Sequence, residues 1–392
     1  MTDPQTKMPF VAIACGGTGG HLFPGLAVAE QLKLRGCAVA LLISPKDVDQ
    51  QAVKSAHGME VFTLPAVGLQ NGNYFSFAGS FVKSLFAARR IFNQRRPAAV
   101  LAMGGFTSAP PILAGNASGA KTFLHESNTI PGKANRFLSR FVNGAFVGFP
   151  EAGARLKTSK VTTTGMPVRA EFKPRGAAAC RTAFGLEPNL PTILVVGGSQ
   201  GASGLNEMIL SALPLLAGKN WQWLHLTGAS DFEKVRVIYA QRGIKAIIKP
   251  FLSEMDLALG AATIAVSRAG ASSLAEIAAM RLPAVLVPFP AAADNHQFSN
   301  ASAFEKSGAA MLLEQKNSTP EKIAAILVKL VEDETARPQM QSALAQWHAP
   351  KAAEQIAESI LSVVARQQEK VAQAKTKKCS CGHAHGATKH AH

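Results

Sequence analysis

Three glycine-rich turns, each directly after a short apolar run, constrain this 392-residue chain more than any other feature. They lie at 16–21, 103–108 and 197–202. Glycine has no Cβ, so the backbone N–H groups of such a turn can approach an anion closely. A helix that begins at the turn adds the positive end of its dipole. Two turns in the first third of the chain and one in its second half predict a cleft that binds phosphate-bearing molecules from both sides.

Apolar runs alternate with helical patterns in two successive series. This alternation predicts two parallel sheets built from right-handed βαβ units, and the chain is too long for one ordinary core. The expected strands are 10–14, 38–43, 99–102, 121–124, 144–147 and 161–164 in the first series, and 192–196, 222–226, 246–249, 264–266 and 284–287 in the second.

The composition also indicates where each domain begins and ends. We expect an N-terminal domain over 8–168 and a C-terminal domain over 169–349, with the boundary just before a Pro-Arg-Gly breaker. Helical spacing predicts a last helix over 350–367. The residues of 368–392 are mainly Lys, Ala, Gln, Gly and His, which is typical of a disordered tail. Its Cys and His residues leave metal binding open, but their spacing matches no standard structural zinc site, so we interpret the tail as solvated.

The chain carries a net charge of +16, and five lysines against one acid in the tail supply about +4 of it. Such a balance favours phosphates, nucleic acid or an anionic lipid surface as partners. With two tyrosines, three tryptophans and no recognisable nucleic-acid module, nucleic acid is the weaker option. Five scattered cysteines, no signal peptide and no apolar segment suited to a bilayer predict a cytoplasmic protein with reduced thiols.

The first turn fits neither of the common nucleotide-binding motifs. A dinucleotide fingerprint would need a glycine where Leu22 stands and an acid where Ser44 ends the next strand. A Walker loop would need a Gly-Lys-Ser/Thr sequence, which does not follow here. What remains is a turn that binds an anion through its amides, with His21 at its exit. A packing turn with a buried histidine is the alternative.

Polar residues also follow the later strands, where α/β sheets place their ligands. The hydroxyl and amide at 199–200 suit a diphosphate. The serines at 272–273 either cap a helix or bind phosphate, and Glu276 either faces solvent or accepts from sugar hydroxyls. The polar groups of 294–297 provide enough donors and acceptors to bind a hexose.

Several motifs in fixed order resemble the MurG family, the N-acetylglucosaminyltransferases of peptidoglycan synthesis. The resemblance covers about 8–367, everything except the tail. Several motifs in one order are far more specific than any one of them. They are 16–21 with Pro24-Gly25, His125-Glu126-x-Asn128, Gly165-x-Pro167-Val168-Arg169, 197–202, Arg268-x-Gly270-Ala271 and Asp294-x-His296-Gln297. Met166 and Ser127 depart from the residues common there, Asn and Gln, which weakens the implied contacts at those two positions.

This resemblance implies a GT-B fold: two Rossmann-like domains facing across a cleft, with the last helix returning to the first domain. It implies inverting transfer of N-acetylglucosamine from UDP-N-acetylglucosamine to lipid I (undecaprenyl-pyrophosphoryl-N-acetylmuramoyl-peptide), giving lipid II and UDP with no cofactor or metal. The expected location is the cytoplasmic face of the bacterial inner membrane. The expected partners are the two substrates, an anionic membrane surface and other wall-synthesis and division proteins, but no nucleic acid.

The resemblance also assigns roles to single residues. We interpret His21 as the general base, with Glu126 as runner-up. The implied donor-binding residues are Thr18, Gly19, Gly20, His21, Asn128, Arg169, Ser199, Gln200, Leu252, Arg268, Ser272, Ser273, Glu276, His296 and Gln297. The acceptor diphosphate is assigned to the two N-terminal turns, through Gly17, Thr18, Gly19, Gly104 and Gly105.

A lipid-linked acceptor requires the enzyme to dock on a membrane. Aromatic and basic residues recur at near-helical spacing after the first strands, which is typical of a helix lying on an anionic membrane. The alternative is a core-facing helix with a solvated basic face. The residues concerned are Phe75, Phe77, Phe81, Lys83, Arg89 and Arg90.

Other functions share parts of this pattern. Another GT-B enzyme that acts on a UDP-sugar, such as a diacylglycerol glycosyltransferase, would share the donor half but not the motifs at 16–21 and 125–128. A catalytically idle, membrane-bound scaffold would have lost the polar motifs, which are present here. A UDP-sugar epimerase would share the architecture without needing the basic aromatic segment.

Overall fold

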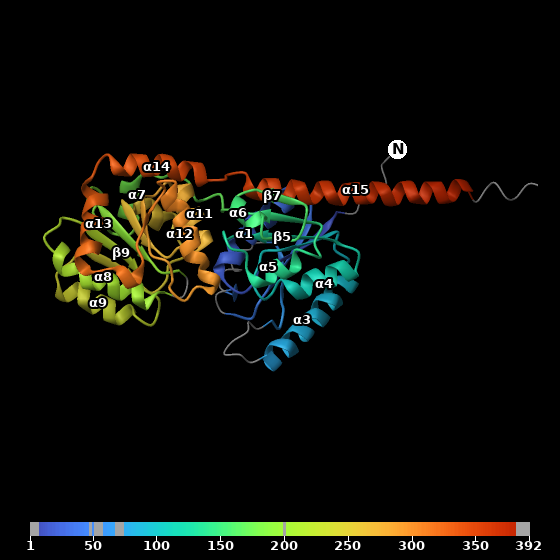
Figure 1. Cartoon of the computed structure of the whole chain (residues 1–392), viewed down its shortest axis with the longest axis horizontal. Coiled ribbons are helices and arrows are strands. Elements are labelled where there is room, and N and C mark those ends of the chain that lie inside the picture. Colours follow the sequence, from blue (N-terminus) through green and yellow to red (C-terminus); the bar gives the residue numbers. More distant parts are fainter. Residues whose placement is uncertain (1–7, 47–48, 51–57, 67–73, 199–200, 382–392) are drawn as a thin grey trace, which may run out of the picture.

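Two lobes, each built on one parallel sheet, make up the molecule (Figure 1). The computed structural model describes residues 8–46, 49–50, 58–66, 74–198 and 201–381. We call the lobe formed by 8–163 and the last helix the N-lobe, and the lobe formed by 177–347 the C-lobe. Helices cover the faces of both sheets.

The N-lobe sheet has seven strands within the described residues, in the order β3-β2-β1-β4-β5-β6-β7, and all neighbours pair in parallel. They are β1 (Phe10–Ala14), β2 (Ala38–Ile43), β3 (Glu60–Thr63), β4 (Ala99–Ala102), β5 (Lys121–Glu126), β6 (Gly144–Val147) and β7 (Val161–Thr163). Its helices are α1 (Gly19–Leu34), α3 (Tyr74–Gln94), α4 (Ala109–Ala117), α5 (Lys133–Leu138) and α6 (Pro150–Gly153).

The C-lobe sheet has six parallel strands in the described part of the chain, in the order β10-β9-β8-β11-β12-β13. They are β8 (Thr192–Val196), β9 (Gln222–Leu226), β10 (Ala246–Lys249), β11 (Ile264–Ser267), β12 (Ala284–Leu286) and β13 (Met311–Leu312). Its helices are α7 (Ala177–Ala183), α8 (Ser203–Leu216), α9 (Phe232–Gln241), α10 (Met255–Ala261), α11 (Ala271–Met280), α12 (His296–Lys306), α13 (Pro320–Glu332) and α14 (Ala336–Trp347), with 3-10 turns η2 (Ala293–Asn295) and η3 (Gln315–Asn317).

These strands confirm the predicted parallel α/β class. All eleven predicted strands are present, with ends that differ by two residues at most. Two further strands, β3 and β13, were not predicted. β3 is an edge strand whose residues are mostly exposed, so it lacks the apolar run of a buried strand, and β13 has only two residues.

Alternate side chains of the N-lobe strands point to opposite faces of the sheet and build two cores. Val11 and Ile13 of β1 pack with α1 and the last helix, whereas Ala12 and Ala14 pack on the side of α3 and α4. The two faces of the sheet are therefore covered by different helices. Helix α4 contacts both α3 and α5, so these three helices form one layer.

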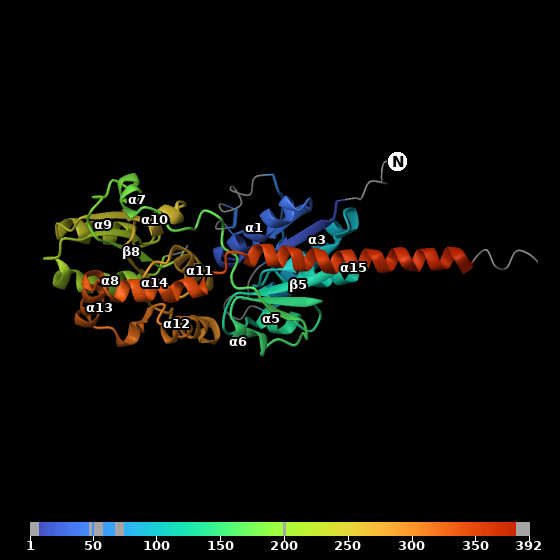
Figure 2. The ribbon, with the colours of Figure 1, turned by 90° about the horizontal axis from the view of Figure 1, so that it is seen from above.

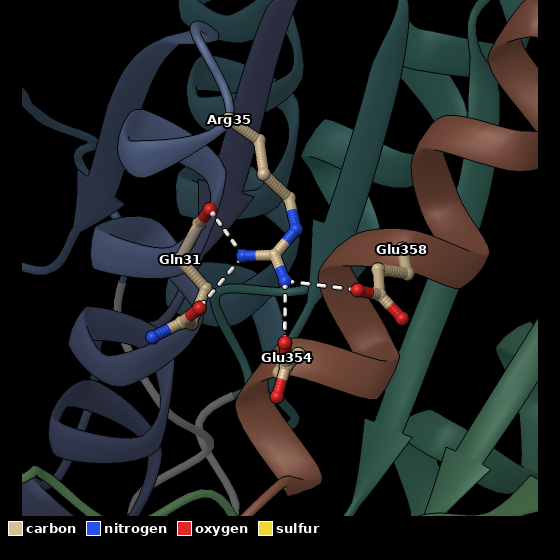
Figure 3. A network of polar contacts seen from close by, with 4 residues as sticks. All are labelled: Gln31, Arg35, Glu354 and Glu358. Carbon is tan, nitrogen blue, oxygen red and sulfur yellow. Dashed lines mark hydrogen bonds and ion pairs between the residues drawn. The ribbon is translucent and has the colours of Figure 1, made fainter.

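The last helix, α15 (Ala352–Cys381), leaves the C-lobe and packs beside α1 of the N-lobe (Figure 2). Its apolar side chains, such as Ile356 and Ile360, are buried in the N-lobe core. At the end of α1, the Arg35 guanidinium donates to Glu354 and Glu358 of α15, both at 2.9 Å, and to Gln31 (Figure 3). Sequence positions more than 300 residues apart are thereby joined.

The same helix continues further than predicted. Disorder was predicted from residue 368, but α15 continues to Cys381, and its end projects beyond the N-lobe in both views. The segment contains no Pro or Gly until Gly382, so nothing in its sequence ends the helix earlier. Residues 382–392 lie outside the described residues.

Candidate active site

The first glycine turn is held by a carboxylate from the protein itself. Asp49 is buried, and its Oδ2 accepts from the Gly17 N–H at 2.6 Å and from both the N–H and the hydroxyl of Ser44. The Gly17 amide is therefore not free for a substrate phosphate, which revises its predicted role at the acceptor diphosphate. Asp49 also ends an Asp-Val-Asp triplet, but Asp47 lies outside the described residues, and among the described residues no three His, Cys, Asp or Glu side chains are grouped so as to hold a metal ion.

The second part of this turn begins helix α1, which starts at Gly19. Thr18, Gly19 and Gly20 thus stand where a helix leaves its first amides without intrahelical acceptors. Pro24 lies inside α1 and has no N–H to donate to the Gly20 carbonyl. The Ser272 hydroxyl at the start of α11 donates to that carbonyl at 3.0 Å. The N-termini of two helices, one from each lobe, therefore meet directly.

His21 lies between this turn and the second glycine turn. A Cβ on Gly104 would stand 2.9 Å from the His21 ring, and one on Gly105 would stand 3.0 Å from it. Both glycines have positive φ. Positions 104 and 105 of the second turn must therefore be glycine so that the His21 imidazole fits. The Gly104 N–H donates to the Ser108 hydroxyl at 3.1 Å, so this amide is also unavailable to a diphosphate, against the prediction.

The environment keeps the His21 imidazole neutral. Burial lowers the pKa of His21 below its usual value of 6.5, while the nearby Glu126 carboxylate opposes that shift. Its Nδ1 is buried without a hydrogen-bond partner. A neutral ring with an unused nitrogen can accept a proton.

Glu126, at the end of β5, organises the loop that follows it. Oε1 accepts from the N–H and the side-chain amide of Asn128 at 2.9 and 3.2 Å, and Oε2 accepts from the Gly132 N–H at 3.0 Å and the Asn135 side chain at 2.9 Å. Both carboxylate oxygens are fully used, and the residue is buried. These contacts suit an anchor for the loop better than a general base.

On the C-lobe side, α12 holds the loop between β11 and α11. Gln297 Oε1 accepts from the N–H groups of Ala269 and Phe289 at 3.2 and 2.9 Å, which leaves its amide nitrogen to donate elsewhere. The His296 Nδ1 lies 2.7 Å from the Ala293 carbonyl, so Nδ1 carries the proton and Nε2 is left as an acceptor. These two side chains can bind a sugar without losing their own supports.

Arg268 and Arg169 are largely committed within the protein. Arg268 is buried and donates to the Val287 and Pro288 carbonyls, both at 3.1 Å, and to Gln315 at 2.8 Å. Only its Nε is buried without a partner. The Arg169 guanidinium lies over the rings of Phe23 and Phe172, 4.5 and 5.0 Å from their centroids. It also pairs with Glu171 at 3.0 Å.

Comparison with known proteins decides the family. The family models for the N-terminal and C-terminal domains of glycosyltransferase family 28 match residues 11–147 and 192–356. A protein of Xanthomonas axonopodis pv. citri is 38% identical over 362 residues, which is 92% of this chain and 83% of that protein. It is named UDP-N-acetylglucosamine–N-acetylmuramyl-(pentapeptide) pyrophosphoryl-undecaprenol N-acetylglucosamine transferase. The chain belongs to the MurG family of glycosyltransferase family 28.

Further matches agree with this assignment. A MurG-family protein of Parasynechococcus marenigrum with the same name is 41% identical over 79% of this chain and 84% of its own length. The crystal structure of Acinetobacter baumannii MurG superposes with a TM-score of 0.71 at 28% identity, covering 91% of this chain and all of that one. A UDP-N-acetylglucosamine 2-epimerase at 13% identity and a TM-score of 0.69 shares the fold alone. These findings confirm the predicted GT-B fold and the predicted enzyme class, a glycosyltransferase.

The structure brings together many of the residues that the MurG resemblance singled out. Gly20 contacts Ser272 across the lobes, and Asn128 is hydrogen-bonded to α12, the helix that carries His296 and Gln297. Ser273 and Glu276 lie with Ser272 on the first turns of α11, and Leu252 packs against the C-lobe core. Ser199 and Gln200 lie outside the described residues.

Three buried polar residues of this MurG-family site were missed by sequence reasoning. Asp49, Asn135 and Asn300 are all buried and hydrogen-bonded to loops of the site. Asp49 follows β2, and Asn135 lies on the short helix α5 after β5, where polar residues usually face solvent. Of the three, Asn300 could have been found from the sequence, because it follows Gln297 by three residues and so lies on the same face of α12.

Proposed function

We propose that this chain transfers N-acetylglucosamine from UDP-N-acetylglucosamine to lipid I, forming lipid II and UDP. The observation that carries the proposal is the similarity to enzymes of that name over 92% of the chain, joined with the meeting of two helix N-termini at Gly20 and Ser272. Each N-terminus favours a negatively charged group. Two of them, from opposite lobes, suit a reaction between two diphosphate-bearing molecules.

The chemistry is a single in-line displacement. The acceptor hydroxyl oxygen attacks the anomeric carbon of the donor as the bond from that carbon to the UDP oxygen breaks. The hydroxyl proton passes to His21, and the electron pair of the broken bond leaves with UDP. The amides of α11 and the Ser273 hydroxyl stabilise the departing charge, each charge-assisted hydrogen bond contributing about 1.5–3 kcal/mol. We place the acceptor diphosphate at Thr18 and Gly19, because the Gly17 and Gly104 amides have other partners.

The direct test is incubation of the purified chain with UDP-N-acetylglucosamine and a lipid I analogue, with mass spectrometry of the products. We expect a disaccharide-bearing lipid and UDP in equal amounts. Release of UDP without the disaccharide would reject lipid I as the acceptor. Formation of UDP-N-acetylmannosamine would indicate an epimerase instead.

Glu276 is proposed to accept from the ribose hydroxyls of the donor. Burial raises the pKa of Glu276 to about 7, with Arg169 opposing the shift and Glu171 adding to it. The carboxylate is therefore ionised above that pH, and an ionised acceptor binds hydroxyls more strongly than a carboxylic acid does. We expect the Kd for UDP-N-acetylglucosamine to fall as the pH rises from 6 to 8. Calorimetry across this range should find no such change in Glu276→Gln, and a retained pH dependence there would assign it to another group.

We also propose that the exposed face of α3 docks on the membrane. Phe75, Val82 and Phe86 are 93%, 48% and 65% exposed and form one stripe along the helix. The exposed Arg89 and Arg90 follow in the next turn. An apolar stripe beside basic side chains is typical of a helix that lies on an anionic bilayer. None of the helices among the described residues is long and apolar enough to cross a bilayer.

This face differs from the predicted one. Phe77 and Phe81 are only half-exposed, with ring centroids 6.3 Å apart, and they lie on the side of α3 nearer the sheet. Phe92 on that side is buried. An exposed pair of rings, Phe137 on α5 and Phe141 just after it, lies in the same helical layer, with ring centroids 5.3 Å apart. The exposed stripe on α3 and the exposed rings of Phe137 and Phe141 both favour membrane contact through this layer of the N-lobe.

Liposome flotation tests the docking face. The triple variant Phe75→Ser, Val82→Ser, Phe86→Ser is expected to bind vesicles containing anionic lipid at least about tenfold more weakly, because it loses the apolar contact and keeps the basic residues. Its thermal stability should hardly change, since the three side chains are exposed. The matched control is Leu34→Ser, which removes a 78% exposed leucine from α1 on the other face of the sheet. Equal flotation of triple variant and wild type would reject this face.

A further inference from the structure

Asn300 occupies the point where the two lobes exchange hydrogen bonds. It is fully buried on α12. Its Oδ1 accepts from both the N–H and the hydroxyl of Thr129 at 3.0 Å. Its Nδ2 donates to Asn128 Oδ1 at 3.0 Å and to the Ala269 carbonyl at 3.2 Å. Two donors and two acceptors thus satisfy the amide group, and they come from the N-lobe loop after β5 and the C-lobe loop after β11.

Each of these loops is also held by its own lobe. Glu126 binds both the N–H and the side-chain amide of Asn128. Gln297, one turn before Asn300, accepts from the Ala269 N–H. The two polar groups of Ala269 are therefore both bound by α12. A continuous chain of hydrogen bonds leads from Glu126 through Asn128 and Asn300 to Ala269, beside the residues proposed to bind the donor.

Helix α12 contacts the N-lobe at its two ends as well. Asp294, just before the helix, pairs with Arg136 of α5. Phe304, one turn after Asn300, stacks on Trp347 with ring centroids 4.4 Å apart and lies 6.4 Å from the ring of Phe149, which follows β6 of the N-lobe. The helix is thus fixed against the N-lobe along its length, so the N-lobe loop, α12 and the Ala269 loop form one packed unit.

We propose that Asn300 is a positioning residue that couples the acceptor side of the site to the donor side. Asn300 joins the loop at Asn128 and Thr129 to the Ala269 loop, so a displacement of the N-lobe loop when the acceptor binds that lobe is carried to the donor side. Each substrate therefore binds more tightly when the other is present. By thermodynamic linkage the effect is the same in both directions. This inference rests on the proposed transferase function and adds to it the means by which the two substrate sides communicate.

The test measures coupling rather than activity. Calorimetry gives the Kd of UDP-N-acetylglucosamine with and without a saturating lipid I analogue that lacks the acceptor hydroxyl, so that no transfer occurs. We expect the analogue to tighten donor binding by about tenfold in the wild type, within the usual range of such couplings. In Asn300→Ala this ratio is expected to fall close to one. An unchanged ratio in Asn300→Ala, or no coupling in the wild type, would overturn the proposal.

Two further variants separate coupling from a general loss of stability. Thr129→Val removes the hydrogen bond from the Thr129 hydroxyl to Asn300. It should lower the coupling ratio when Asn300 is present, and it should not change the ratio further when it is combined with Asn300→Ala. Equal effects of Thr129→Val in both backgrounds would count against the inference. The control is Asn206→Ala, a buried asparagine that bonds to Thr227, Asp231 and His225 within the C-lobe. It should lower thermal stability and leave the ratio unchanged. If the wild type transfers sugar to lipid I but the ratios contradict these expectations, this inference fails while the proposed function stands.

Discussion

His21→Gln is expected to lower kcat by about 10²–10⁴-fold, the usual contribution of a general base, while donor binding stays close to that of the wild type. Glutamine keeps much of the volume that the Gly104 and Gly105 surfaces enclose, so the substitution removes the proton acceptor rather than the packing. The measurements are kcat with the lipid I analogue and, separately, the calorimetric Kd of the donor. Near-normal turnover would eliminate His21 as the base.

The pH profile gives a second reading of the same residue. Burial lowers the pKa of His21 from 6.5, and a base must be unprotonated to act, so kcat of the wild type should stay level at neutral pH and fall only below 6.5. This fall of kcat at acidic pH should be absent in His21→Gln. The pH effect of Glu276, in contrast, appears in the Kd of the donor. His225→Gln is the control, because His225 is a buried histidine of the C-lobe that contacts Tyr239 and Asn206 away from the site. It should affect stability and leave the profile of kcat unchanged.

The second large effect is expected at Glu126. Glu126→Gln replaces one carboxylate oxygen by an amide nitrogen. Either the two donors of Asn128 or the donors of Gly132 and Asn135 then lose their acceptor and face another donor. Each unsatisfied donor costs about 1–3 kcal/mol, so we expect the free energy of unfolding to fall by about 2–6 kcal/mol. Turnover should fall with it because the loop that carries Asn128 is no longer fixed.

Urea unfolding together with a pH profile distinguishes an anchor from a base. As an anchor, Glu126 affects stability and lowers kcat equally at every pH. A variant as stable as the wild type that has lost the acidic limb would instead make Glu126 the base. Glu126→Asp keeps the charge but shortens the side chain by one carbon, so it should recover part of the stability and little of the loop geometry.

The fold could be predicted from the sequence because its strands are buried on both faces. Runs such as 193–196 in β8 are apolar throughout, and glycine turns follow them, so both the strands and their parallel arrangement can be predicted from local pattern. β3 could not be found in this way, since its position depends on pairing with β2 and not on apolar composition. The full length of α15 was not predicted, because the composition of the segment after residue 367 suggested disorder. Its residues form a helix because they have high helix propensity.

The site was predicted in its residues better than in their roles. The glycines of both N-terminal turns were expected to present free amides, but Gly17 is bonded to Asp49 and Gly104 to Ser108. Those partners are 32 and 4 positions away along the chain. Pattern reasoning detects that a turn needs glycine, yet it cannot tell whether the reason is an anion or the ring of His21 on the opposite turn. Only the tertiary arrangement separates these two causes.

The return of α15 to α1 has a consequence for how the protein is made on the ribosome. One face of the sheet that is synthesised first is covered by Ile356, Ala357 and Ile360, which are among the last residues of the fold to emerge. Until then the part of that face that α1 does not cover stays open on the nascent chain. The C-lobe, whose sheet and helices lie between 177 and 347, can meanwhile complete its own core. The half of the polypeptide translated first is therefore expected to mature last, and to depend most on chaperones during translation.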